Sequence, residues 1–255
     1  MGSPPEAGFA HEMEKPWHLV RVAAFFISTC CVTRAQYRLF DQHYEYAADF
    51  IEREDRQPPS GWDEPVDQRP IGGATEFDAY CFALWLGEGY RLPSEVEWEG
   101  AAWGGIDRNA HPDFVIGVSP FTSECTADQV NHDDGLTMDE SIPMKAGLYR
   151  GYAVPVRFAG FSVNGFGLWQ MSGNVWEWCD SVWQPDLFSA TVCETRYFSS
   201  ESASADFFDR KWNSARGGSW DCIAWFCRCS CRDCSELWSH STGIRLSRDR
   251  FPPDM

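Results

Sequence analysis

Apolar residues recur at helical spacing in the N-terminal half of the chain. Tyr37, Phe40 and Tyr44 lie three or four positions apart, and Thr33 stands where it can cap a helix. The pattern predicts a helix that begins directly after Thr33 and turns its aromatic side toward a core.

Two more helices are predicted farther along. The first runs from about Thr75, its expected cap, to Gly87, its expected stop. The apolar face that we expect for it consists of Phe77, Tyr80, Cys81, Leu84 and Trp85. The other is short and begins after Ser94, because Ser94 and Glu97 have the spacing of a capping box.

Strand-like patterns occupy other parts of the chain. They cover residues 18–32, 168–178, 220–232 and 243–246, and long loops are predicted at 53–69 and 105–165. The mixture predicts an α+β fold. We expect residues 1–16 to form a loose leader, 17–249 a single domain and 250–255 a tail.

Composition narrows the classes of function. The net charge of −17 disfavours nucleic acid and anionic membrane surfaces, both of which attract Lys and Arg. The chain has no run of about 18 apolar residues, so we expect no insertion into a bilayer. Eleven cysteines, an odd number, favour a reduced compartment over a complete disulfide framework. We expect the cytoplasm, or the cell surface if a leader was removed.

Five of the eleven cysteines lie between residues 222 and 234. The segment is either a thiol active site or a patch selected for contact. If residues 226–232 form a strand, Cys227, Cys229 and Cys231 share one face and are expected to be buried thiols. Alternate strand positions point poorly at one tetrahedral centre, so a zinc site is disfavoured.

Four blocks identify a family resemblance. They are Val32–Tyr37, Arg91–Ala102, Gly167–Trp178, and Arg216–Trp220 closing with Thr242–Leu246. In this order they resemble the formylglycine-generating enzyme family of sulfatase-modifying factors. The resemblance implies a C-type-lectin-like fold with a small mixed sheet, flanking helices and long loops that carry function.

Family oxidases convert a substrate cysteine to formylglycine with Cu(I) held by two cysteines. Counted forward from Trp220, Cys222 and Cys227 match those positions, and Ser219 matches the active-site serine. Counted back from Arg228 and Arg232, the second cysteine position falls on Ala224 instead. The resemblance to an oxidase is therefore interrupted within this segment.

Another branch of the fold comprises variable proteins of diversity-generating retroelements. These proteins carry a hypervariable stretch between an RGGSW motif and a TGxRL-type strand, which corresponds here to residues 216–249. The contact positions implied are Asp221, Cys222, Ile223, Trp225, Phe226, Cys231, Asp233, Cys234, Glu236, Leu237, Trp238 and His240. Large aromatics among small polar residues suit such a surface. We expect a non-enzymatic protein that binds a protein or another ligand through residues 221–241, with the Cu(I) oxidase as the alternative.

The family also implies a calcium site. Its ligands here would be the side chains of Gln170 and Glu177 and the carbonyls of Gly173 and Val175. Gln170 departs from the Asn or Asp usual in the family, so the site is open to test.

Overall fold

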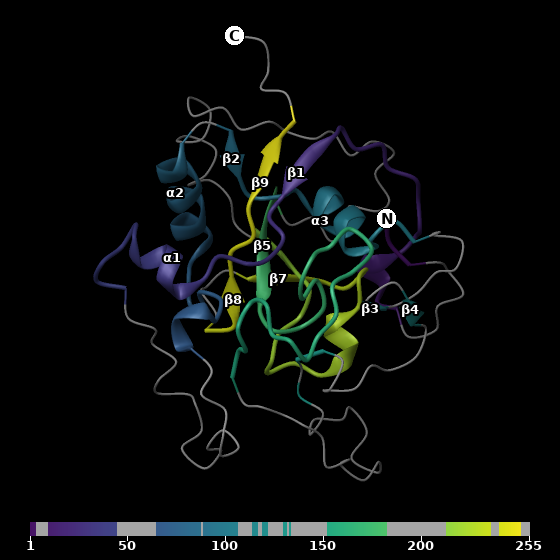
Figure 1. Cartoon of the computed structure of the whole chain (residues 1–255). Helices are drawn as coiled ribbons and strands as arrows, with labels where there is room; N and C mark the ends of the chain where they lie inside the picture. The colour runs from purple at the N-terminus through teal and green to yellow at the C-terminus, as the bar shows by residue number, and fades with distance from the viewer. Residues whose placement is uncertain are drawn as a thin grey trace.

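A computed structural model gives the structure of the protein. It describes residues 1–3, 10–44, 65–87, 89–106, 114–116, 119–121, 130–131, 133, 152–182, 213–235 and 240–250. Short elements and long connections alternate along the chain (Figure 1). No helix among these residues is long and apolar enough to cross a membrane.

Two small sheets organise the fold. The larger has the order β7-β6-β5-β8, from Arg232–Ser235, Asn213–Arg216, Trp176–Val182 and Thr242–Gly243. Its pairs are antiparallel except for β5 with β8, which is parallel. The smaller sheet has the order β1-β9-β2, from Phe25–Ile27, Ser247–Asp249 and Tyr90–Arg91. A hairpin joins β3 (Phe114–Ile116) to β4 (Ser119–Phe121). The predicted α+β class is confirmed.

Among the described residues, three α-helices flank the sheets, and the three predicted caps are confirmed. They are α1 (Arg34–Arg38), α2 (Glu76–Leu86) and α3 (Glu95–Ala102), and capping boxes begin at Thr33, Thr75 and Ser94. In Figure 1, α1 and α2 lie on one side of the sheets and α3 on the other. Short 3-10 helices add η1 (Glu12–Glu14), η3 (Val66–Gln68) and η6 (Ala224–Cys227).

The predicted core face of α2 is wrong. Phe77, Leu84 and Trp85 are exposed, whereas Ala79, Phe82 and Ala83 are buried. The helix is apolar on nearly every side, so spacing could not select a face. The two alanines present a small surface that lets the helix approach the core closely.

Two predicted strands are mostly wrong. Residues 18–32 form a strand only at Phe25–Ile27. Residues 220–231 form turns and η6, because Phe226 N–H donates to the Ile223 carbonyl at 3.0 Å and Cys231 N–H to that of Arg228 at 3.1 Å. These local bonds take backbone groups that a sheet would need.

The strand predicted at 168–178 begins only at Trp176. Gln170, Gly173 and Asn174 have φ of 53°, 74° and 75°, in the left-handed region that interrupts extended backbone. The strand predicted at 243–246 is divided between β8 and β9.

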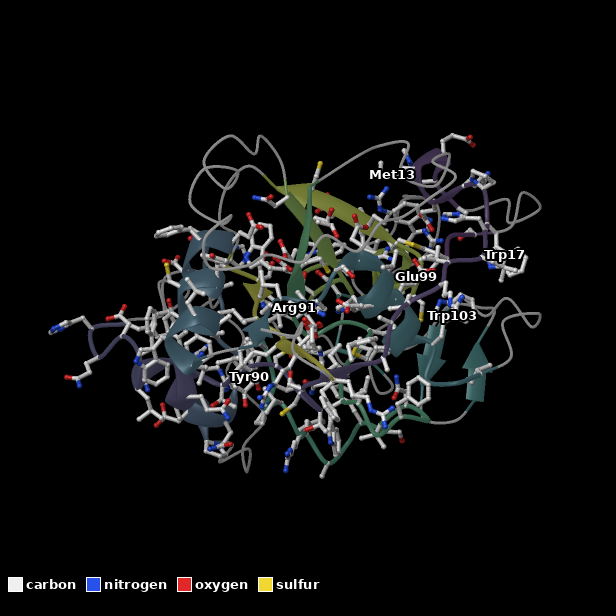
Figure 2. The ribbon with its side chains drawn as sticks, turned by 90° about the horizontal axis from the view of Figure 1, so that it is seen from above. Met13, Trp17, Tyr90, Arg91, Glu99 and Trp103 are labelled. Carbon is white, nitrogen blue, oxygen red and sulfur yellow. The ribbon has the colours of Figure 1, made fainter. Side chains whose placement is uncertain are left out.

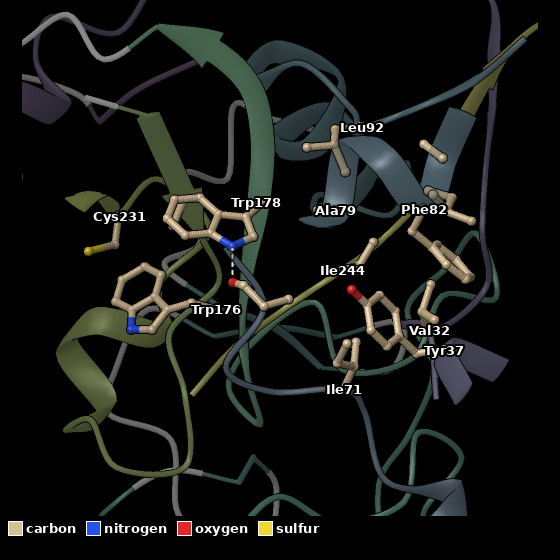
Figure 3. Packing of buried hydrophobic residues seen from close by; sticks show 14 residues of the cluster. Val32, Tyr37, Ile71, Ala79, Phe82, Leu92, Trp176, Trp178, Cys231 and Ile244 are labelled. Carbon is tan, nitrogen blue, oxygen red and sulfur yellow. Dashed lines mark hydrogen bonds between the residues drawn. The ribbon is translucent and has the colours of Figure 1, made fainter. Parts of the chain in front are cut away.

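The largest core cluster lies between α2 and the larger sheet. Val32, Tyr37, Phe82, Trp176, Trp178 and Ile244 pack there, and Trp178 Nε1 donates to the Ala74 carbonyl at 2.8 Å (Figure 3). Half-buried Trp225 and Phe226 pack against this cluster from outside. The core therefore supports the loop that the sequence singled out.

The described part of the predicted leader, residues 1–3 and 10–16, is not loose. Ser3 and Glu14 are buried, and Ser3 N–H donates to the Glu14 carbonyl at 2.7 Å. Glu14 also pairs with Arg228, 214 residues away in the sequence. Burial of a charged side chain ties this segment to the domain.

Candidate functional site

The RGGSW segment leaves the end of β6 in a tight turn. Gly217 and Gly218 have φ of 98° and 72°, which side-chain-bearing residues rarely adopt. A Cβ on Gly218 would stand 2.7 Å from Cys227 Sγ. Glycine is therefore required for this turn to lie against η6.

Buried arginines hold the segment from beneath. Arg216 pairs with Glu99 of α3 and donates to the Cys231 carbonyl at 2.6 Å. Arg232 pairs with Glu95 through two hydrogen bonds of 2.6 and 2.7 Å. Each charge has a buried partner, so these contacts fix the path of the chain in a way that unpaired charges could not.

Exposure divides the segment into two sets. Asp221, Cys222, Ile223, Trp225 and Phe226 are each partly exposed, as are Cys234 and His240, and Asp233 is exposed. The intervening motif residues are buried: Arg216, Ser219, Trp220, Cys227, Arg228, Cys229, Ser230 and Arg232. Ala224, a motif position in the sequence interpretation, is partly exposed. The predicted contact residues Glu236, Leu237 and Trp238 lie outside the described residues.

The buried thiols require one correction. Cys227, Cys229 and Cys231 are buried as predicted, but they do not share a strand face. Cys231 belongs to the cluster of Trp176 and Trp178, whereas Cys229 packs with Trp98 and Met171. The prediction that Cys231 contacts a ligand does not fit the structure, because its side chain is only 1% exposed. Figure 3 shows Cys231 beside Trp176 and Trp178 at the edge of this cluster.

A polar cluster lies at the start of the exposed set. His240 Nε2 is 2.9 Å from Asp221 Oδ2, and Ser219 Oγ donates to the other Asp221 oxygen. Ser219 Oγ is also 3.0 Å from Cys222 Sγ. The cluster connects residue 240 to the turn after Trp220 and so joins the two ends of the contact segment.

Titration in this cluster follows from burial and charge. Burial and the neighbouring Asp221 carboxylate raise the pKa of the Cys222 thiol to about 11. Burial alone would raise the pKa of Asp221, but hydrogen bonds from His240 and Ser219 outweigh it and lower that pKa. At neutral pH the cluster therefore holds a carboxylate beside a protonated thiol.

Two sulfur atoms lie against the Gly218–Ser219 turn. Cys222 Sγ contacts Ser219, and Cys227 Sγ faces Gly218. Soft sulfur donors suit Cu(I), so the pair fits this ion by donor type. Among the described residues no group of three or more His, Cys, Asp or Glu side chains gathers as a metal site.

The predicted calcium ligands do not fit a calcium ion. Both Glu177 oxygens accept hydrogen bonds from Arg245, at 2.7 and 2.9 Å. Gln170 Oε1 accepts from Asn174 Nδ2 at 2.8 Å, and the Gly173 carbonyl accepts from the Val175 N–H. A guanidinium, a side-chain amide and a backbone N–H therefore use oxygen atoms of three of the four predicted calcium ligands.

The sequence interpretation missed two contributors. Asn174 bridges Gln170 and Asn131 in a buried amide network, and Glu14 pairs with Arg228. No spacing rule relates residues so far apart in the chain. The signal was indirect, since the buried Arg228 needed a carboxylate partner.

Curated proteins with known activities are similar over nearly the whole chain. A formylglycine-generating enzyme of Thermomonospora curvata is 26% identical, covering 97% of this chain and 89% of that one. A hercynine oxygenase of Mycobacterium tuberculosis is 29% identical over 92% of this chain. The chain spans about half the length of that oxygenase, 55%.

Solved structures share the fold at low identity. PvdO from Pseudomonas aeruginosa has a TM-score of 0.68 at 21% identity, covering 98% of this chain and 90% of that one. Treponema denticola variable protein 1 has a TM-score of 0.64 at 19% identity, with 97% and 90% covered. A family model described as the sulfatase-modifying factor enzyme 1-like domain matches residues 1–250, and the chain belongs to that family.

Proposed function

We propose that this chain is a ligand-binding protein of the diversity-generating retroelement type. Its contact surface consists of residues 221–223, 225–226, 233–234 and 240. The partner is a protein or another macromolecule, and the surrounding fold is a single domain that holds this surface in place.

The separation of exposed and buried positions carries the proposal. Between Arg216 and Arg232, every described contact position except Cys231 keeps part of its surface, and the paired arginines lie beneath. Such a division lets exposed residues change while the charges that hold the backbone stay the same. A structural loop that only covers its own core would not require it.

Aromatic geometry gives this surface a rigid centre. The rings of Trp225 and Phe226 meet edge to face with centroids 4.9 Å apart. The Arg228 guanidinium lies 4.4 Å from the Trp225 ring centroid. Aromatic anchors that are already ordered lose little entropy on binding and are typical of contact surfaces.

The gene's surroundings provide the first test. A near-copy of the stretch encoding residues 216–249, differing at adenines and next to a reverse transcriptase gene, is the expected finding. Its absence would remove diversification from the proposal and leave only an unchanging binding surface.

A binding test examines the surface itself. Peptides selected from a random library on the wild-type protein are the probe, and Trp225→Ala should weaken their binding by about 10-fold or more, as for interface anchors. The matched control is Trp85→Ala, since Trp85 is an exposed aromatic on α2, away from the segment. Equal affinities for wild type and Trp225→Ala would overturn the assignment of the surface.

A Cu(I)-dependent oxidase acting on a substrate cysteine is the second candidate function. The 3.0 Å contact between Ser219 Oγ and Cys222 Sγ favours it, together with the similarity to a formylglycine-generating enzyme. Cys222 and Cys227 would hold the ion, and bound Cu(I) would supply the oxidative chemistry.

Competition with a Cu(I) chelator tests this candidate. Tight binding that is lost in Cys222→Ser and kept in Cys81→Ser, a partly exposed thiol on α2, would support the oxidase. Equal copper binding by wild type and Cys222→Ser would exclude Cys222 as a ligand.

A further inference from the structure

The N-terminal segment reaches the contact surface through one buried ion pair. Glu14 ends η1 and is 1% exposed, and Arg228 follows η6 and is 2% exposed. Two hydrogen bonds of 2.6 and 2.8 Å join the guanidinium to the two carboxylate oxygens. Ser230 Oγ donates to the same carboxylate at 2.7 Å. This bidentate geometry fixes the plane of the guanidinium.

The same guanidinium also contacts Trp225. Arg228 Nε donates to the Trp225 carbonyl at 2.9 Å, and the Trp225 ring stacks on the guanidinium. The backbone and the ring of this residue are therefore both tied to one group. Glu14 is itself buried and holds that group in place through the paired hydrogen bonds.

A second contact joins the same two segments. Arg232 Nη1 donates to the Met13 carbonyl at 3.3 Å. Figure 2 shows Met13 beside the strands at this end of the larger sheet. Two successive N-terminal residues thus contact the segment before and within β7.

We infer that Glu14 is a positioning residue for the contact surface: through Arg228 it orients Trp225, so the N-terminal segment forms part of the binding architecture. This inference rests on the proposed function. Without the carboxylate, the buried guanidinium would turn toward water and leave the face of the Trp225 ring. Trp225 would then sample several orientations, and binding would have to select one of them.

Fluorine NMR of protein labelled with 5-fluorotryptophan tests the positioning step without any ligand. Trp225→Phe identifies the Trp225 resonance among the thirteen tryptophans. In Glu14→Gln this resonance should shift and broaden or split. The matched control is Glu12→Gln, since Glu12 belongs to the same 3-10 helix but its side chain is 88% exposed. An unchanged Trp225 resonance in folded Glu14→Gln would overturn the inference.

Arg228→Lys provides a second variant if Glu14→Gln does not fold. It keeps a positive charge toward Glu14 but loses the planar fork and its stacking on Trp225. The same change in the Trp225 resonance is expected. A native resonance in this variant would contradict the role given to the guanidinium.

Affinity is the second readout, with the selected peptides as the probe. Glu14→Gln should weaken binding about 10-fold while Glu12→Gln binds as wild type, because a disordered anchor must be ordered on binding. If Trp225→Ala leaves binding unchanged, the proposed surface fails whatever Glu14 does. If Trp225→Ala weakens binding but Glu14→Gln affects neither resonance nor affinity, only the positioning role fails.

Discussion

Arg216, Arg228 and Arg245 are buried, and each lies against a carboxylate. Burial by itself would lower the pKa of Arg245, but the Glu177 carboxylate raises it above the ordinary value, so the guanidinium stays charged. The same Glu177 was one of the four expected calcium ligands. A side-chain cation therefore pairs with a carboxylate that the family resemblance assigned to a metal ion.

Removing the charge of Glu177 should strongly destabilise the protein. We expect Glu177→Gln to lower the free energy of unfolding by about 3–5 kcal/mol, because Arg245 would be left buried without its carboxylate. Urea denaturation measures the change. The control is Arg38→Gln, whose partly exposed pair with Asp67 should contribute less than about 1 kcal/mol. A similar loss of unfolding free energy in both variants would contradict the importance given to the buried pair of Glu177 and Arg245.

The raised pKa of Cys222 predicts slow alkylation at neutral pH. The thiolate reacts and the thiol does not, so the rate at Cys222 should keep rising until about pH 11. Asp221→Asn should increase the rate at neutral pH, because its carboxylate contributes to the raised pKa. Mass spectrometry of the Cys222 peptide after timed iodoacetamide treatment measures both effects. A rate that levels off near pH 8.5, as for an ordinary thiol, would contradict the prediction.

Helices and strands show where local signals are sufficient. Each described α-helix begins directly after the residue whose side chain caps it. Helix α3 also contributes to two charge pairs, Glu95 with Arg232 and Glu99 with Arg216. The cap needs only neighbouring residues, whereas the face that a helix buries depends on what it meets. α2 illustrates both, since its ends were predicted correctly and its buried face was not.

Two phenylalanines on α2 test that correction. Phe82 is 2% exposed and Phe77 is 45% exposed. We expect Phe82→Ala to reduce the free energy of unfolding by about 3–5 kcal/mol, through lost packing and a cavity. Phe77→Ala should stay within about 1 kcal/mol of wild type. Denaturation midpoints measure both changes. A lower midpoint for Phe77→Ala than for Phe82→Ala would contradict the observed buried face.

The molecule as a whole joins its two terminal regions. Glu14 and Arg228 connect them by side chains, and β1 pairs with β9 in the smaller sheet. The contact surface is supported by the largest core cluster, against which Trp225 and Phe226 pack. The partly exposed positions of the segment are thereby separated from the buried charge pairs that hold the fold.

Libraries of variants measure this separation. Randomising Asp221, Ile223 and Trp225 should yield many folded proteins, because these side chains are partly exposed. Randomising Arg216, Arg228 and Arg232 should yield few folded proteins, since each replacement leaves a buried carboxylate without its guanidinium partner. Protease resistance of displayed variants is the measurement. Equal fractions of folded members would contradict the division of the segment.

The sequence alone was enough for the family, the helix starts and the burial of Cys227 and Cys229, since each depends on neighbours in the chain or on short motifs. It also singled out the segment that became the candidate site. Only the tertiary structure decided that Glu14 pairs with Arg228 and that Arg245 pairs with Glu177. Those pairings join segments far apart along the chain, and burial selects them by charge and shape, which no local pattern records.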